Sequence, residues 1–235
     1  DGVGTRMFFN PNKAAFRAGY VDGTQWDAAN IGNYSTAMGY NTTAPGPYST
    51  AMGAETTASG PVSTAMGGGT NASGSSSTAM GFGTNALGVF STAMGEVTTA
   101  SGPASTAMGR STTASGITST AMGDGTTASG SRSTAMGYFT TAPSYAETAI
   151  GRYNTTYTPA SATAWNTADR LFVVGNGTGT GVNSSNALTI TKDGTMNIND
   201  AYDMPTADGT ANFVMSTNGA GVVSFVDPNT LVTPT

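Results

Sequence analysis

The chain contains no cysteine and no histidine among its 235 residues, and it carries few charges. The absence of cysteine excludes disulfides and thiolate metal sites. The absence of histidine removes the commonest general base and the commonest metal ligand. Charged residues make up only 9% of the chain, against about 25% in an average soluble protein. These absences point away from an enzyme and from a metalloprotein.

The sparse charges also limit the possible partners. The formal net charge is −5 and no Lys/Arg cluster occurs, so we expect no nucleic-acid partner. No apolar run reaches the ~20 residues of a membrane helix, so we expect no direct membrane insertion by this segment. The chain begins at Asp1 without a signal-peptide pattern, which is expected of a processed product or a fragment.

Small residues dominate instead, and they repeat. The string STAMG at residues 35–39 recurs every 14 residues, and a ninth copy reads ETAIG. A second block, as in TTASG at residues 56–60, follows each first block. Two positions of the first block form an alanine column, filled in all nine copies, and a methionine column, in which isoleucine replaces methionine in the ninth copy. These columns are Ala37, Ala51, Ala65, Ala79, Ala93, Ala107, Ala121, Ala135 and Ala149, and Met38, Met52, Met66, Met80, Met94, Met108, Met122, Met136 and Ile150.

A 14-residue unit predicts a parallel β-roll, which is a β-solenoid with two short strands per coil. The unit is too short for helical solenoid repeats, which have periods of about 33 residues or more. Two strands of about four or five residues and two tight corners fill it. Coils would stack about 4.8 Å apart, so nine coils span roughly 40 Å. Columns of glycine beginning at Gly39 and Gly46 mark the corners, where we expect positive φ angles.

The faces of the strands differ in how much they vary. In the first strand Thr36 and Met38 share one face and Ser35 and Ala37 share the other. Neither face varies along the nine copies, so we interpret one as the roll interior and the other as covered by a neighbouring chain. The sequence leaves open which is which. In the second strand the columns from Thr42 and Ala44 are expected to line the interior, and the Thr/Asn column from Thr43 to face solvent.

The residues after the corners vary in size, charge and aromaticity, so we expect any recognition of a receptor or partner to take place there. Exposed aromatic residues at these positions are candidate contacts for a glycan or a partner protein. The alternative is that they pack on neighbouring coils and shield the corners. The candidates are Tyr40, Tyr48, Phe82, Phe90, Tyr138 and Phe139.

Over residues 32–151 the unit G-x-x-S-T-A-M-G-x-x-T-T-A-S-G resembles the head repeats of trimeric autotransporter adhesins. The resemblance implies a left-handed parallel β-roll, three chains side by side, and an extracellular role in binding a surface receptor, a glycan or matrix. The column that begins at Thr42 replaces a common alanine of that pattern. This replacement implies a slightly more polar interior.

The remaining segments divide into smaller modules. Residues 1–31 are expected to lead into the first coil and cap it, and residues 152–168 to form a transition. Residues 169–200 are expected to form a β-rich shaft module and residues 201–235 a C-terminal β module. Segments 170–177 and 186–195 resemble strands of trimeric phage tail fibres, and segments 202–211 and 216–226 resemble modules that precede a C-terminal chaperone. A phage or injection-system tail fibre is therefore an alternative to a cell-surface adhesin.

Other chemistries find little support. The thirteen acidic residues show no recurring spacing, and no base is available to activate a serine, so we expect no catalysis. The Asp-Gly turns at Asp124 and Asp193 offer one carboxylate each, whereas calcium needs six to eight oxygens, so no metal or cofactor is expected. Ice binding by the outward Thr43 column is a lesser alternative, because Asn71 and Asn85 interrupt the threonines. The sequence therefore predicts an elongated, non-catalytic homotrimer for attachment or display.

Overall fold

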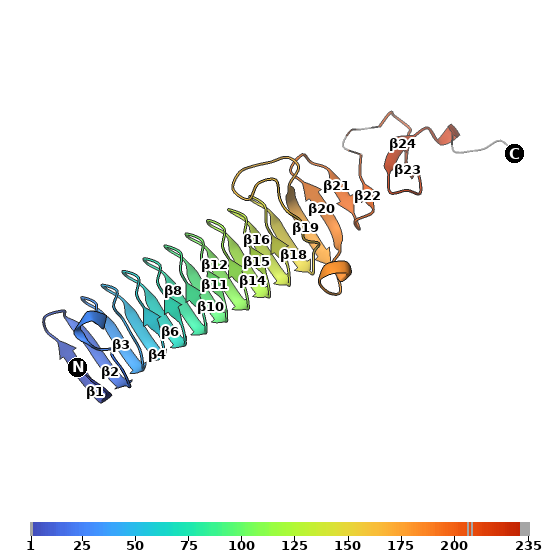
Figure 1. Ribbon diagram of the computed structural model, residues 1–235. Coiled ribbons are helices and arrows are strands. Elements are labelled where there is room, and N and C mark those ends of the chain that lie inside the picture. The colour runs from blue at the N-terminus through green and yellow to red at the C-terminus, as the bar shows by residue number, and fades with distance from the viewer. Residues whose placement is uncertain (1, 206, 208, 231–235) are drawn as a thin grey trace.

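The computed structural model describes residues 2–205, 207 and 209–230. Figure 1 shows an elongated rod of stacked strands with the two termini at opposite ends. The described residues form an all-β parallel solenoid of about eight turns with almost no helix. Only three short 3₁₀ turns occur in this part of the chain: η1 (Ala28–Asn30), η2 (Gly181–Asn183) and η3 (Pro228–Thr230). The prediction of an all-β roll is confirmed.

Each repeat contributes one five-residue first strand to a large sheet. Successive first strands pair in parallel without any shift, so Thr lies on Thr, Ala on Ala and Met on Met. This register follows from the constant 14-residue period. The strands are β3 (Thr36–Tyr40), β4 (Thr50–Ala54), β6 (Thr64–Gly68), β8 (Thr78–Phe82), β10 (Thr92–Glu96), β12 (Thr106–Arg110), β14 (Thr120–Asp124), β16 (Thr134–Tyr138) and β18 (Thr148–Arg152).

The second segment of each repeat forms a narrower seven-stranded sheet. Its strands have two residues, fewer than the four or five that we predicted. The ladder ends early because the backbone N–H groups of Ser59 and Gly60 both donate to the carbonyl of Ala72, and the chain then turns. The strands are β5 (Thr57–Ala58), β7 (Asn71–Ala72), β9 (Asn85–Ala86), β11 (Thr99–Ala100), β13 (Thr113–Ala114), β15 (Thr127–Ala128) and β17 (Thr141–Ala142).

The structure settles which face of the first strand lies inside. The columns that begin at Ser35 and Ala37 are fully buried, and so are the second-strand columns from Thr42 and Ala44. Thr36 and Met38 instead point outward and are partly exposed. Between the two ends of the roll, side chains as short as Ser, Ala and Thr fill the space between the two sheets, whereas a methionine needs the open side. The Thr43 column lies on the outer face of the second sheet, as predicted.

The two glycine columns share one physical cause, the close approach of the next coil, and differ in the backbone φ angle. Gly39 and its equivalents adopt φ values between 113° and 124° through Gly137, as expected. The expectation of positive φ is wrong for Gly46 and its equivalents, which do not adopt it. There a Cβ would overlap the carbonyl oxygen of the glycine one coil further along. Glycine is needed at these corners because the coils approach closely.

An antiparallel hairpin and a loop cover the first coil. Strand β1 (Gly4–Asn10) pairs with β2 (Ala15–Val21), and β2 continues in parallel onto β3. The Arg17 side chain enters the roll interior, where it donates to Ser35 Oγ at 2.8 Å and to the Ala44 carbonyl at 3.2 Å. Burial lowers the pKa of this guanidinium to about 10. The buried Trp26 indole donates to the Thr42 carbonyl at 2.9 Å.

The last coil ends on a buried polar cluster. Glu147 stands in the interior serine column and Ser144 stands in the Gly46 column. The Glu147 carboxylate accepts hydrogen bonds from the Ser144 backbone N–H at 2.9 Å and from the Tyr157 hydroxyl at 3.3 Å. The Lys192 ammonium donates to Ser144 Oγ at 2.9 Å. Burial raises the pKa of Glu147 and lowers that of Lys192.

Beyond this cluster the large sheet continues with a change of direction. Strand β19 (Arg170–Asn176) pairs in parallel with β18, and the next strands are antiparallel: β20 (Asn186–Thr191), β21 (Met196–Ile198) and β22 (Tyr202–Asp203). The large sheet therefore runs through fifteen strands. Strands β23 (Val214–Thr217) and β24 (Val223–Val226) form a separate hairpin. No helix in the described part of the chain has the length and apolarity that a membrane crossing requires.

Candidate interface and attachment surfaces

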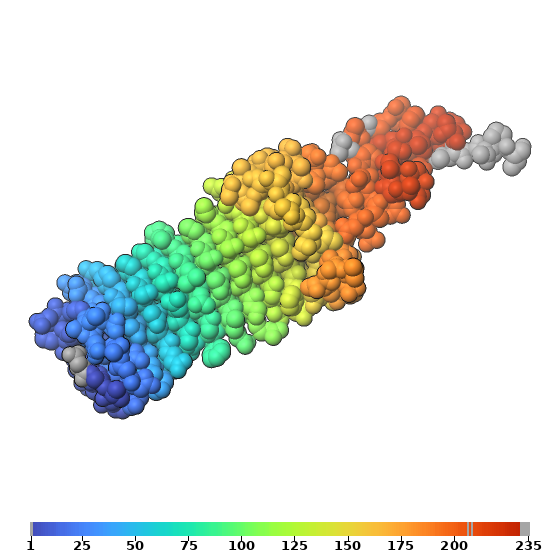
Figure 2. All heavy atoms as spheres, in the orientation of Figure 1, coloured from blue at the N-terminus to red at the C-terminus, as the bar shows by residue number. Residues whose placement is uncertain are grey.

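The outward face of the large sheet carries a continuous, uncharged stripe of threonine and apolar side chains, which we call the seam. Its central part consists of the Thr36 and Met38 columns, from β3 to β18. All of these side chains lie on one face because the parallel register never shifts. Met136 is the most exposed methionine of this column, at 42%, and the other members are partly buried. The seam is thus a long, partly exposed surface without a charged residue. Figure 2 shows the regular stacking of the coils along the rod.

The seam continues past both ends of the roll with larger side chains. At the amino end Phe9 pairs with Phe16, which pairs with Thr36. Met7 is 73% exposed and lies on the same face, opposite Ala18. At the carboxyl end Thr148 and Ile150 pair with Phe172 and Val174, and the same face then carries Ile190, Leu188, Met196 and Ile198. The stripe therefore runs along the large sheet from β1 to β21.

The corners form two rims along opposite edges of the roll. Rim 1 follows the first strands, and rim 2 follows the second segments. In every coil the second residue of each rim is left-handed, with φ between 44° and 64°. This conformation costs a residue other than glycine roughly 1–2 kcal/mol. The left-handed residues are Asn41, Glu55, Gly69, Gly83, Val97, Ser111, Gly125, Phe139 and Tyr153 on rim 1, and Tyr34, Tyr48, Val62, Ser76, Phe90, Ala104, Thr118, Arg132 and Ala146 on rim 2.

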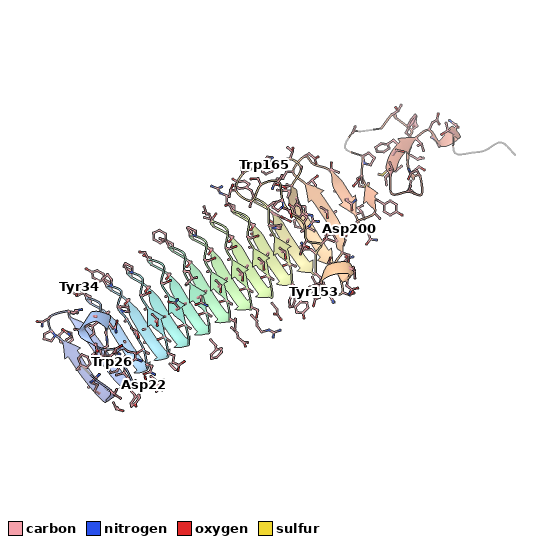
Figure 3. The ribbon with its side chains drawn as sticks, in the orientation of Figure 1. Asp22, Trp26, Tyr34, Tyr153, Trp165 and Asp200 are labelled. Atoms are coloured by element: carbon pink, nitrogen blue, oxygen red, sulfur yellow. The ribbon has the colours of Figure 1, made fainter. Side chains whose placement is uncertain are left out.

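The six predicted aromatic contacts do not form one surface. Tyr40, Phe82, Tyr138 and Phe139 lie on rim 1, whereas Tyr48 and Phe90 lie on rim 2. All six are exposed, from 40% for Phe139 to 66% for Phe90. Figure 3 shows the separation of the rims through two labelled residues, because Tyr34 projects from one edge of the rod and Tyr153 from the other.

Near the amino end the aromatic residues stack on neighbouring coils. Tyr34 and Tyr48 stack with ring centroids 4.9 Å apart on rim 2. Tyr20 and Tyr40 stack at 5.7 Å on rim 1. The Tyr40 hydroxyl donates to Asp22 at 3.1 Å. The pKa of Asp22 is lowered, first by its hydrogen bond with Asn41 and then by the one with Tyr40, and the pKa of Tyr40 is raised by Asp22. These contacts fit the alternative that such rings pack on adjacent coils.

Near the carboxyl end three rings gather into one cluster. Tyr138 and Phe139 meet edge to face at 4.8 Å, and Phe139 stacks on Tyr153 at 5.3 Å. Tyr138 also contacts Tyr153 edge to face at 5.2 Å. A hydrogen bond with Tyr138 raises the pKa of Tyr153. Of the predicted contacts, only Tyr138 and Phe139 are thus brought together in one group.

A pocket of about 100 Å³ lies beside this cluster, where the roll meets the β19–β20 loop. Two of its walls are aromatic, Phe139 and Tyr153, and Gly125 lies at its edge. The remaining lining is polar and uncharged. It consists of Thr141, Asn154, Thr156, Thr180, Gly181 and Ser184.

Sequence reasoning missed most of this pocket. Tyr153 lies one repeat after Phe139, so extending the 14-residue period past the last STAMG copy would have found it. Thr180 and Ser184 come from a loop outside the repeat and have no comparable signal. Among the described residues, no group of three or more acidic residues is arranged to hold a metal ion.

Comparison with models of known protein families identifies the repeats of the roll. The YadA head domain repeat (2 copies) matches residues 31–56, 58–86, 86–112 and 114–140. No curated protein matches the chain. Heads of this type form homotrimers in general, and the adhesins that carry them are exposed at the surface. The β-roll of this chain is therefore built from YadA head domain repeats, which point to a fibre like the trimeric autotransporter adhesins.

Proposed function

We propose that this chain is a subunit of an extracellular homotrimeric fibre that attaches to a surface receptor or a glycan. In this assembly the seams of three copies pack together around the fibre axis, while the rims and the outer sheets remain accessible. The proposal includes no catalytic step, in keeping with the YadA-like repeats.

The seam is the observation that carries the proposal. A solvated strand face would accept varied polar residues, yet the seam keeps methionine in eight of nine coils and isoleucine in the ninth. Fully burying a methionine side chain contributes about 1.5–3 kcal/mol. Because these side chains are already partly buried, we assign each roughly 1 kcal/mol on assembly. Nine positions then supply on the order of 10 kcal/mol per chain, before the larger residues at both ends are added.

Two biological settings fit such a fibre. One is a cell-surface adhesin or filament, which the YadA-like repeats favour. The other is a tail fibre of a phage or an injection system, which rests on the resemblance of the segments after residue 169. Genes for tail components beside this gene would support the second setting, and a gene or segment for a membrane anchor would support the first.

The mass of the chain in solution tests the assembly. Sedimentation equilibrium at micromolar concentration should give three times the chain mass of 23.4 kDa. A stable monomer under these conditions would contradict the proposal, because the seam would then be exposed to water without a partner. Binding of the purified trimer to host cells or to immobilised glycans would test attachment separately.

A further inference from the structure

We infer that the pocket beside Phe139 and Tyr153 binds one pyranose ring of a neutral glycan. This inference rests on the proposed attachment function and names the ligand class for one site on the fibre. The pocket is the place where a predicted aromatic contact lies next to a cavity and a set of hydroxyl groups. Its position at the junction of the roll and the β19–β20 loop is marked in Figure 3 by Tyr153.

The aromatic wall is built from rings of two successive coils that pack against each other. Phe139 stacks on Tyr153 at 5.3 Å with an interplanar angle of 14°. Tyr138 braces both rings from the side. Gly125 leaves no side chain under Phe139, and a Cβ there would come within 2.9 Å of the Phe139 ring. A pyranose has an apolar C–H surface that packs against such preformed aromatic walls.

The polar wall offers hydroxyl groups that the fold does not use. Asn154 has both ends of its amide occupied, because it accepts from the Thr141 N–H at 2.8 Å and donates to the Thr141 carbonyl at 2.9 Å. It therefore fixes the wall. Within the described chain, no hydrogen bond involves the hydroxyls of Thr141, Thr156 and Thr180. These three groups are free to bind the hydroxyls of a sugar.

The charges around the pocket favour a neutral ligand. None of the residues that line it is ionisable except Tyr153, whose pKa is raised by its hydrogen bond to Tyr138. The nearby Arg152 guanidinium lies over the Tyr153 ring at 5.6 Å, and Asp124 is paired with Arg110. An acidic sugar would find no cation in the pocket lining. The volume of about 100 Å³ has room for no more than one ring, so the rest of the glycan would extend into solvent.

The trimer that we propose would carry three such pockets at the base of the roll. A single pocket of this size is expected to bind weakly, in the millimolar range. Three pockets on one fibre would raise the strength of attachment to a glycan-coated surface through multivalency. The site therefore suits a fibre that attaches to a densely glycosylated surface.

The test measures sugar binding to the full chain by saturation-transfer NMR. The probes are methyl β-galactoside, methyl α-mannoside and N-acetylglucosamine, with sialic acid as the charged comparison. Phe139→Asn removes a ring at a left-handed position that asparagine tolerates. Phe90→Asn is the matched control, because Phe90 has the same chemistry and φ of 59° on rim 2. Thr180→Val removes one free hydroxyl without changing the size of the side chain.

We expect at least one neutral probe to bind the unaltered trimer. Phe139→Asn should weaken that binding about tenfold, Thr180→Val should weaken it severalfold, and Phe90→Asn should leave it unchanged. Absence of binding by all three neutral probes would overturn the inference, as would an equal loss in Phe90→Asn or tighter binding of sialic acid. If these results came from an intact trimer that still attached to cells, the inference alone would fail. A monomeric chain would instead refute the proposed function.

Discussion

Replacing Met94 with glutamate places a carboxylate in the middle of the seam. Met94 belongs to β10 and lies in register between Met80 and Met108. In the single chain its side chain is partly exposed, so the roll itself tolerates the change. In a trimer assembled through the seam, three carboxylates would face one another near the fibre axis without a cation beside them.

The expected loss is a substantial fraction of the seam's contribution to assembly, which amounts to roughly 30 kcal/mol for three chains. Three methionines that each contribute roughly 1 kcal/mol are lost, and each unpaired carboxylate removed from water costs several kcal/mol. The total reaches about 10 kcal/mol per trimer, which corresponds to about seven orders of magnitude in the association constant. Protonation relieves the repulsion, so part of the assembly should return near pH 4.

Sedimentation equilibrium at pH 7 and pH 4 measures this effect directly. The control is Ile117→Glu, which adds the same charge on rim 2, where Ile117 is 54% exposed. Met94→Glu should be monomeric at pH 7 with unchanged β-sheet circular dichroism, and Ile117→Glu should remain trimeric. A Met94→Glu chain that stays trimeric at pH 7 and micromolar concentration would refute the role of the seam.

Three further predictions concern the roll and its outer face. Gly95→Ala should lower the free energy of unfolding by more than about 3 kcal/mol, because its Cβ would overlap the carbonyl oxygen of Gly109. Gly69→Ala has open space around it and should cost only roughly 1–2 kcal/mol. Equal losses in urea unfolding would contradict this account. Burial raises the pKa of Glu147, so its folded state binds a proton more tightly and stability should fall as the pH rises above about 4.3. Glu147→Gln, which removes the buried charge, should therefore be more stable than the unaltered chain at pH 7 by on the order of 1 kcal/mol, and equally stable below pH 4 in chemical denaturation; a variant less stable at pH 7 would show the sign to be wrong. Finally, the Thr43 column contains Asn71 and Asn85, so we expect no thermal hysteresis, and clear activity would replace attachment with ice binding.

The period of the repeat was enough to predict the roll, but it did not reveal which face of the first strand lies inside. Both faces of the first strand are uniform, since Ser35 and Ala37 recur as faithfully as Thr36 and Met38. The thickness of the interior decides which face lies inside, and the sequence of one strand does not reveal that thickness. It follows from the second segment, because Thr42 and Ala44 already fill the space opposite Ser35 and Ala37. Side-chain length then forces methionine to the outside.

The ends of the roll show where repeat reasoning stops. Arg17 pairs with Ala37 in the sheet, yet its side chain fills the open end of the interior and hydrogen-bonds to the carbonyls of Ser35 and Ala44. Glu147 and Ser144 depart from their columns because no further coil follows to exclude their side chains. Such substitutions are visible in the sequence as breaks in a column. Their partners, such as Lys192, come from distant segments and require the structure.

The groups that hold the coils together are different from the rim side chains that face outward, so one roll can carry varied contacts. The coils are held together by the backbone ladder, the small interior residues and the close approach at the glycine columns. None of these depends on the identity of the rim residues. The left-handed position on rim 2 accordingly accepts tyrosine, valine, phenylalanine, threonine and arginine in different coils, each at a cost of roughly 1–2 kcal/mol. A change of rim residue therefore alters what the fibre contacts while the coil geometry stays the same, and this freedom is what an attachment surface needs.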